Sequence, residues 1–223
     1  MEPNLLLALE DFVPVLLTML ALVWLTRLAF SMNRQSGYIA VIGSLLVVLG
    51  GLLKAASKLL WVVSGEQISW MENSLFLLMA PGFAMLSWSI WTGQRKIFRG
   101  IQTRIPYLVP IIILILVAGG AAYFSGIEQG RTWFIILLTS VVLMTTIMLI
   151  LLSRHAWHYQ HRLTAFLFLL YLLITLALNG MARTPSPSIS MEWIKQLVNT
   201  TAAAILAYAS WRLWRENRDI KLM

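Results

Sequence analysis

Seven long apolar segments constrain what this chain of 223 residues can fold into. Each is about as long as the roughly 20 residues that a helix needs to cross the bilayer core. A segment in lipid must satisfy its own backbone hydrogen bonds, which favours helices over open strands. We therefore predict an all-α, polytopic membrane protein, with residues 1–223 forming a single seven-helix transmembrane domain. The predicted helices lie near residues 12–30, 38–63, 70–92, 105–125, 132–153, 163–182 and 190–214.

The composition supports this class of protein. Hydrophobic residues make up 59% of the chain and charged residues only 12%, whereas a soluble domain carries roughly 25% charged residues. The chain contains no cysteine, so disulfides, thiolate metal ligands and cysteine nucleophiles are excluded. The first residues, MEPNLLLALEDF, lack the basic region of a signal peptide. We therefore expect the first apolar segment to remain as a helix.

The positions of the charges predict the orientation in the membrane. The loops after the first, third and fifth segments, together with the C-terminal tail, hold twelve basic and two acidic residues, a net charge of +10. The opposite side holds five basic and seven acidic residues, a net charge of −2. Because Lys and Arg favour cytoplasmic loops, we predict that the N-terminus is outside and the C-terminus is cytoplasmic, in a bacterial inner membrane. The basic excess would then contact anionic lipid headgroups rather than nucleic acid.

Short sequence matches suggest a parallel internal repeat. LTRLAFSMNRQ aligns with LSRHAWHYQHR when Arg27 is placed on Arg154, and SWSIW at 87–91 resembles SWRLW at 210–214. These matches predict two copies in a three-plus-one-plus-three plan, residues 1–96 and 127–218, joined by the apolar helix at 105–125. The alternative is that apolar segments resemble one another through composition alone.

The three-plus-one-plus-three plan with the N-terminus outside resembles the architecture of the SWEET, PQ-loop and PnuC transporters. This resemblance implies transport of a small solute. The chain departs from the PQ-loop pattern because Pro14 is followed by Val15 rather than glutamine. Seven-helix rhodopsins share the helix count and orientation, but Lys195 lies two residues from Trp193, near the expected outer interface rather than at mid-membrane. No site residue is therefore transferred from either group.

Polar side chains recur on one face of several predicted helices and suggest a pocket in the outer half of the membrane. Charges inside an apolar segment are costly and usually face a polar cavity or a partner. We predict an outward-facing pocket for a small anionic or zwitterionic ligand. An alternative interpretation is structural ion pairs, such as Lys58 with Asp11 or Glu72, and Arg183 with Glu192. The predicted lining residues are Lys54, Lys58, Asn73, Asn179, Arg183, Lys195 and Asn199.

Two further features have both a functional and a structural interpretation. Pro81 and Gly82 lie inside the third segment, where proline usually kinks a helix, and they would form either a gate or a fixed bend. His155, His158 and His161 follow the fifth segment without a nearby carboxylate. We expect these histidines to belong to a solvated loop, and we predict no metal site and no cofactor.

The sequence favours three functions in a definite order. A small-solute transporter or permease comes first, because of the repeat and the polar pocket. A non-enzymatic receptor or sensory subunit comes second, and a scaffold or accessory subunit third; both would act with a partner protein or as a homo-oligomer. An enzyme is not expected, because no serine–histidine pair, paired carboxylates or metal-ligand cluster falls at membrane depth.

Overall fold

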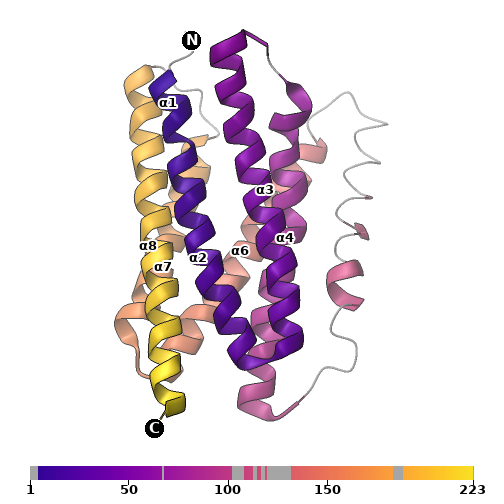
Figure 1. Cartoon of the computed structure of the whole chain (residues 1–223), viewed down its shortest axis with the longest axis vertical. Coiled ribbons are helices and arrows are strands. Elements are labelled where there is room, and N and C mark those ends of the chain that lie inside the picture. Colours follow the sequence, from indigo (N-terminus) through magenta and orange to yellow (C-terminus); the bar gives the residue numbers. More distant parts are fainter. Residues whose placement is uncertain are drawn as a thin grey trace.

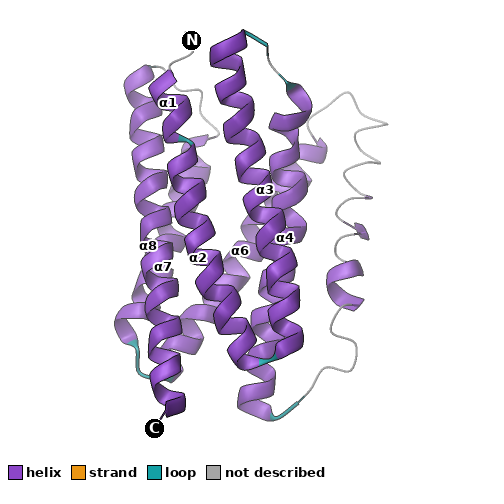
Figure 2. Ribbon diagram, in the orientation of Figure 1, coloured by secondary structure: helices purple, strands orange, loops and turns teal. Residues whose placement is uncertain are grey.

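The computed structural model describes residues 5–66, 68–101, 108–112, 115–116, 119, 132–182 and 188–222. The described residues form helices and contain no strand, which confirms the all-α prediction (Figure 2). The helices are α1 (Leu5–Glu10), α2 (Phe12–Met32), α3 (Arg34–Ser64), α4 (Ser69–Arg99), α6 (Thr132–His158), α7 (Arg162–Ala182) and α8 (Ile189–Leu222).

The prediction of seven membrane-spanning helices is supported in part. Five helical stretches are long and apolar enough to cross a bilayer, which is consistent with an integral membrane protein: Leu5–Met32, Arg34–Ser64, Ser69–Arg99, Trp133–His158 and Arg162–Met181. The segment at 105–125 lies largely outside the described residues. Helix α8 is long enough to cross a bilayer but is less apolar than these five stretches, because polar residues such as Gln196 and Asn199 occupy its first half.

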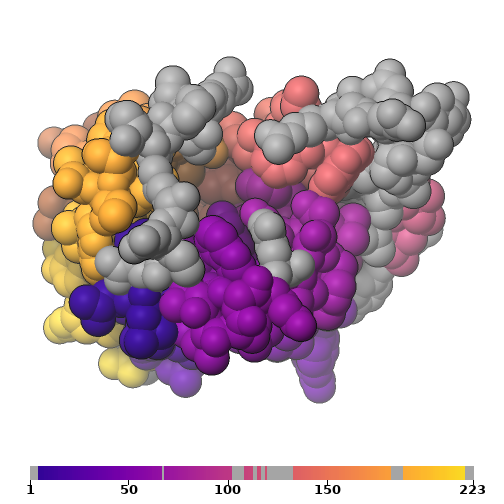
Figure 3. All heavy atoms as spheres, turned by 90° about the horizontal axis from the view of Figure 1, so that it is seen from above, coloured from indigo at the N-terminus to yellow at the C-terminus, as the bar shows by residue number. Residues whose placement is uncertain are grey.

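The long described helices pack as a closed ring. In ring order, α2 packs on α3, α3 on α4, α4 on α6, α6 on α7, α7 on α8, and α8 returns to α2 (Figure 1). We call the end that holds α1, Gly65 and the start of α8 the amino-terminal face. The end that holds Asn33, Gly100 and Gln160 is the carboxy-terminal face. Figure 3 looks onto the amino-terminal face.

Local backbone geometry explains where the helices end. Gly65 and Gly100 adopt left-handed conformations with φ of 75° and 64°, and their N–H groups bond the carbonyls of Trp61 and Lys96. Glycine adopts this conformation without the steric cost that a Cβ imposes. Asn33 is extended and separates α2 from α3, so that the chain reverses direction between them. The break at Asn33 therefore places α2 and α3 side by side.

Helices α3 and α4 approach each other closely at two glycines. A Cβ atom on Gly43 would lie 2.7 Å from the carbonyl oxygen of Gly82, and a Cβ on Gly82 would lie 2.8 Å from the carbonyl oxygen of Gly43. Pro81 lies inside α4, which continues as one helix from Ser69 to Arg99. Gly82 therefore serves the helix contact. The gating role of Pro81 and Gly82 stays a prediction.

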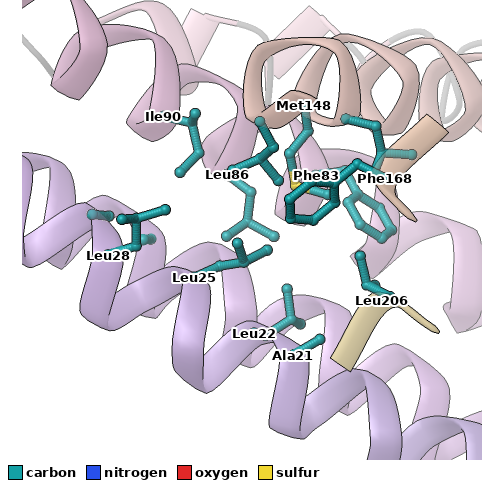
Figure 4. Close-up of a cluster of buried hydrophobic side chains, with 14 of the residues drawn as sticks. Ala21, Leu22, Leu25, Leu28, Phe83, Leu86, Ile90, Met148, Phe168 and Leu206 are labelled. Carbon is teal, nitrogen blue, oxygen red and sulfur yellow. The ribbon is translucent and has the colours of Figure 1, made fainter. Parts of the chain in front are cut away.

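The hydrophobic core fills the carboxy-terminal half of the ring. Its largest fully buried side chains include Phe168, Leu22, Met148 and Leu206, and the buried ring of Phe83 packs among them (Figure 4). These residues come from α2, α4, α6, α7 and α8. Side chains from five helices thus close the centre of the bundle on this side.

Candidate functional site

A cavity of about 300 Å³ lies between the helices in the amino-terminal half of the ring. All six ring helices contribute to its wall. Its lining on α4 runs from Leu75 to Phe83, and on α8 it includes Gln196 and Asn199. Phe83 also belongs to the hydrophobic core, so its phenyl side chain forms the floor of the cavity. The cavity therefore ends where the close-packed core begins.

Three of the predicted site residues line this cavity: Lys54, Asn179 and Asn199. They come from α3, α7 and α8. Tyr171 and Thr175 also line it, as expected from their four-residue spacing to Asn179 on one helix face. The periodicity of polar residues therefore identified part of the wall on three separate helices.

Lys54 brings a cation to the cavity. Its side chain is exposed and lines the cavity wall. The ion pairs found among the described residues join Lys58 to Asp11, and His161 and Arg212 to Glu216. Within the part of the chain that the structure describes, Lys54 thus has no carboxylate within ion-pair distance. Its positive charge is available to a ligand.

Asp11 joins three helices at the rim of the cavity. Its carboxylate lies 2.6 Å from Lys58 Nζ on α3 and accepts a hydrogen bond from Gln196 Nε2 on α8. The neighbouring Glu10 accepts a hydrogen bond from Thr200 Oγ1, also on α8. The structural interpretation of Lys58, an ion pair with Asp11, is therefore confirmed. The lysine that was predicted to line the pocket instead holds its rim together.

The remaining predicted residues do not meet at the cavity. Asn73 is exposed near the start of α4, and neither Asn73 nor Lys195 lines the wall. Lys58 lies outside the wall as well, while its partner Asp11 lines it. Arg183, and with it the predicted pair with Glu192, lies outside the described residues.

Hydroxyl groups that the sequence interpretation missed complete the polar lining. Thr18, Thr145 and Thr146 line the cavity from α2 and α6. Thr145 is only 5% exposed, and its Oγ1 has no hydrogen-bond partner among the described residues. Buried polar atoms usually have partners, so this hydroxyl is a candidate contact for a bound molecule. In the sequence, the adjacent Thr145 and Thr146 in an otherwise apolar segment were the feature that could have indicated this part of the lining.

The expectation of a solvated histidine loop is wrong for His155. Helix α6 continues to His158, beyond the predicted end at residue 153. His155 therefore remains on the helix and is fully buried, with its ring 5.8 Å from Phe98 and 5.0 Å from Tyr159. His158 is exposed. Among the described residues, no group of three His, Cys, Asp or Glu side chains is placed to hold a metal ion.

The Asp11 junction provides a stability test. We expect Asp11→Asn to lower the thermal unfolding midpoint by a few degrees, because it removes an ion pair worth up to about 1 kcal/mol, and each kcal/mol shifts the midpoint by about 2–4 °C in a chain of this size. Thermal unfolding of the purified protein in detergent measures the shift. Glu66→Gln, at an exposed carboxylate, is the control. Equal midpoints for Asp11→Asn and the control would contradict the assigned role of Asp11.

Comparison of this chain with protein-family models, curated proteins and solved structures found no significant match. The functional interpretation therefore depends on the cavity, the helix ring and the placement of charge.

Proposed function

We infer that this protein is a small-solute transporter whose binding site is the cavity between the six ring helices. The observation that carries the proposal is that every ring helix contributes to the cavity wall. A movement of one group of helices against the other would therefore change the cavity. With the orientation predicted from the loop charges, the amino-terminal face is outside. The cavity then lies in the outer half of the membrane.

The burial pattern supports the proposed repeat. Arg27 and Arg154 are 127 residues apart, and with this shift buried residues of α2 fall on buried residues of α6. Ser87 and Ser210 are 123 residues apart, and with this shift the same holds for α4 and α8. The paired residues are Leu22 with Leu149, Leu25 with Leu152, Ala29 with Ala156, Phe83 with Leu206, Leu86 with Ala209, and Ile90 with Leu213.

Polar contacts at the two seams between the proposed copies also correspond. Buried Gln94 donates a hydrogen bond to the carbonyl of Leu151, which joins α4 to α6. Buried Asn217, at the equivalent position on α8, donates to Ser31 Oγ on α2. Two seams of similar design support a pseudo-twofold arrangement of parallel copies. Parallel repeats are found in transporters, which alternate access by moving one repeat against the other.

The lining of the cavity favours a small anionic or zwitterionic solute. Lys54 supplies a positive charge without a described carboxylate partner, and Asn179, Asn199 and Thr145 supply neutral hydrogen-bonding groups. A volume of about 300 Å³ is at the lower end of the range for ligand pockets. A carboxylate on the solute would bind next to Lys54 through charge-assisted hydrogen bonds.

The experiment is uptake by proteoliposomes that contain the purified protein. A panel of radiolabelled carboxylates, amino acids and small uncharged solutes is presented at the amino-terminal face. The proposal expects saturable uptake of an anionic or zwitterionic compound. Saturable binding without flux would favour a receptor, and co-purification of a stoichiometric partner without either would favour an accessory subunit; each outcome would overturn the proposal.

A further inference from the structure

A second cavity, of about 940 Å³, lies near the carboxy-terminal face and is lined mainly by α4 and α6, with Leu169 from α7. We call it the α4–α6 groove. It is separate from the six-helix cavity, because the two share no lining residue. One part of its wall is apolar and includes Ile150 and Leu169, which are exposed. The indoles of Trp91 and Trp157 lie in the same wall. Such an apolar wall at the end of membrane helices can accommodate a hydrocarbon chain.

Three arginines surround the apolar wall: Arg95, Arg99 and Arg154. Among the described residues, the ion pairs involve other groups, so no described carboxylate neutralises these three side chains. The guanidinium of Arg95 lies 4.7 Å from the ring centre of Trp91, which orients it by a cation–π contact. The groove thus combines a concentrated positive charge with apolar surface.

At the equivalent seam between α8 and α2, indole and guanidinium groups pack on one another. Trp24 occupies the position that corresponds to Leu151 in the groove, and its ring lies 4.7 Å from that of Trp214. Arg27, which corresponds to Arg154, lies 4.8 Å from the Trp24 ring and 5.7 Å from the Trp214 ring. The second seam therefore uses its arginine and indole groups for packing. In the α4–α6 seam, the smaller Leu151 stands at the position of Trp24 and lines the cavity.

We propose that the α4–α6 groove binds one anionic phospholipid, with the lipid phosphate between Arg95, Arg99 and Arg154 and an acyl chain against Ile150 and Leu169. Arginine forks match phosphate oxygens in paired hydrogen bonds. A soluble phosphate would meet the arginines but leave the apolar wall uncovered, whereas a lipid satisfies both. Basic pockets between membrane helices are suited to such headgroups. This proposal is independent of the transport proposal.

Native mass spectrometry of the full chain in detergent tests the assignment. The protein is titrated with phosphatidylglycerol and with phosphatidylcholine, and the occupancy of the first bound lipid is measured. We expect phosphatidylglycerol to bind more tightly, and the double variant Arg95→Gln/Arg154→Gln to weaken its binding at least about 10-fold. The double variant Arg95→Lys/Arg154→Lys should retain part of the affinity and the preference for phosphatidylglycerol, because both charges remain while the paired hydrogen bonds of the guanidinium groups are lost. Arg27→Gln is the matched control and should leave binding unchanged.

Each of the other outcomes would overturn the proposal. Equal binding of the two lipids, or unchanged binding in the glutamine variant, would exclude a site at these arginines. An equal loss in Arg27→Gln would indicate diffuse charge rather than a groove. Displacement of the lipid by millimolar inorganic phosphate would indicate a site for soluble phosphate. If the glutamine variant does not fold, loss of the lipid preference in the lysine variant would also count against the proposal.

Discussion

Lys54→Met should weaken binding of the transported solute about 10- to 100-fold and reduce uptake accordingly. Lys54 is the cation of the six-helix cavity and has no carboxylate partner among the described residues. Hydrogen bonds to charged groups contribute about 1.5–3 kcal/mol, and each 1.4 kcal/mol changes affinity tenfold. Methionine keeps much of the length of the side chain but removes its charge. Uptake by proteoliposomes, measured over a range of solute concentrations, gives the change.

Two further variants separate a binding role from a general effect of charge. Lys54→Arg should retain part of the activity, because the charge remains while the geometry changes. Lys195→Met should transport like the unmodified protein, because Lys195 does not line the cavity. Size-exclusion profiles and thermal unfolding establish that each variant is folded. Normal uptake by Lys54→Met, or an equal loss in Lys195→Met, would contradict a binding role for Lys54.

Gly82→Ala in α4 should destabilise the protein, whereas the same methyl group added at Gly180 of α7 should not. The added Cβ would lie 2.7 Å from Val47 Cγ2 and 2.8 Å from the carbonyl oxygen of Gly43. The second contact involves backbone, so α3 and α4 would have to separate. Overpacking of this kind typically costs about 1–3 kcal/mol, or a fall of roughly 2–12 °C in the thermal unfolding midpoint for a chain of this size.

Gly180→Ala is the matched control for Gly82→Ala. Gly180 lies inside helix α7, and a Cβ atom there would meet nothing within 4 Å among the described residues. Because alanine favours a helix more than glycine does, this variant should keep or slightly raise the unfolding midpoint. If the two variants had equal midpoints, the close α3–α4 contact at Gly43 and Gly82 would be wrong.

Sequence patterns alone predicted the helical class and part of the cavity wall. Apolar segments of membrane length have few alternatives to a helix, so the class follows from hydropathy. Lys54, Asn179 and Asn199 converge because each lies on the polar face of its helix. A four-residue spacing preserves a helix face, so this part of the wall could be derived without knowing which helices are neighbours.

Other features depend on helix rotation and packing, which a single sequence does not specify. An error of one residue rotates a helical position by about 100°, which explains how Lys195 was placed in the wall instead of Gln196. The pairing of Asp11 with Lys58 and Gln196 requires α2 to meet both α3 and α8. The close contact of Gly43 with α4 likewise requires α3 and α4 to be neighbours. These outcomes follow from the ring order, which local periodicity does not contain.

The most direct test of the proposed outward-facing cavity is the accessibility of Thr175→Cys. The natural chain has no cysteine, so a single introduced thiol has no background. Thr175 lines the cavity, while Ala209 is fully buried in the core and provides the control Ala209→Cys. A membrane-impermeant thiol reagent is added to right-side-out and to inverted vesicles. We predict labelling of Thr175→Cys from the outside only, protection by the transported solute, and no labelling of Ala209→Cys. Labelling of Thr175→Cys only in inverted vesicles would contradict the orientation, and labelling from neither side would contradict a solvated cavity.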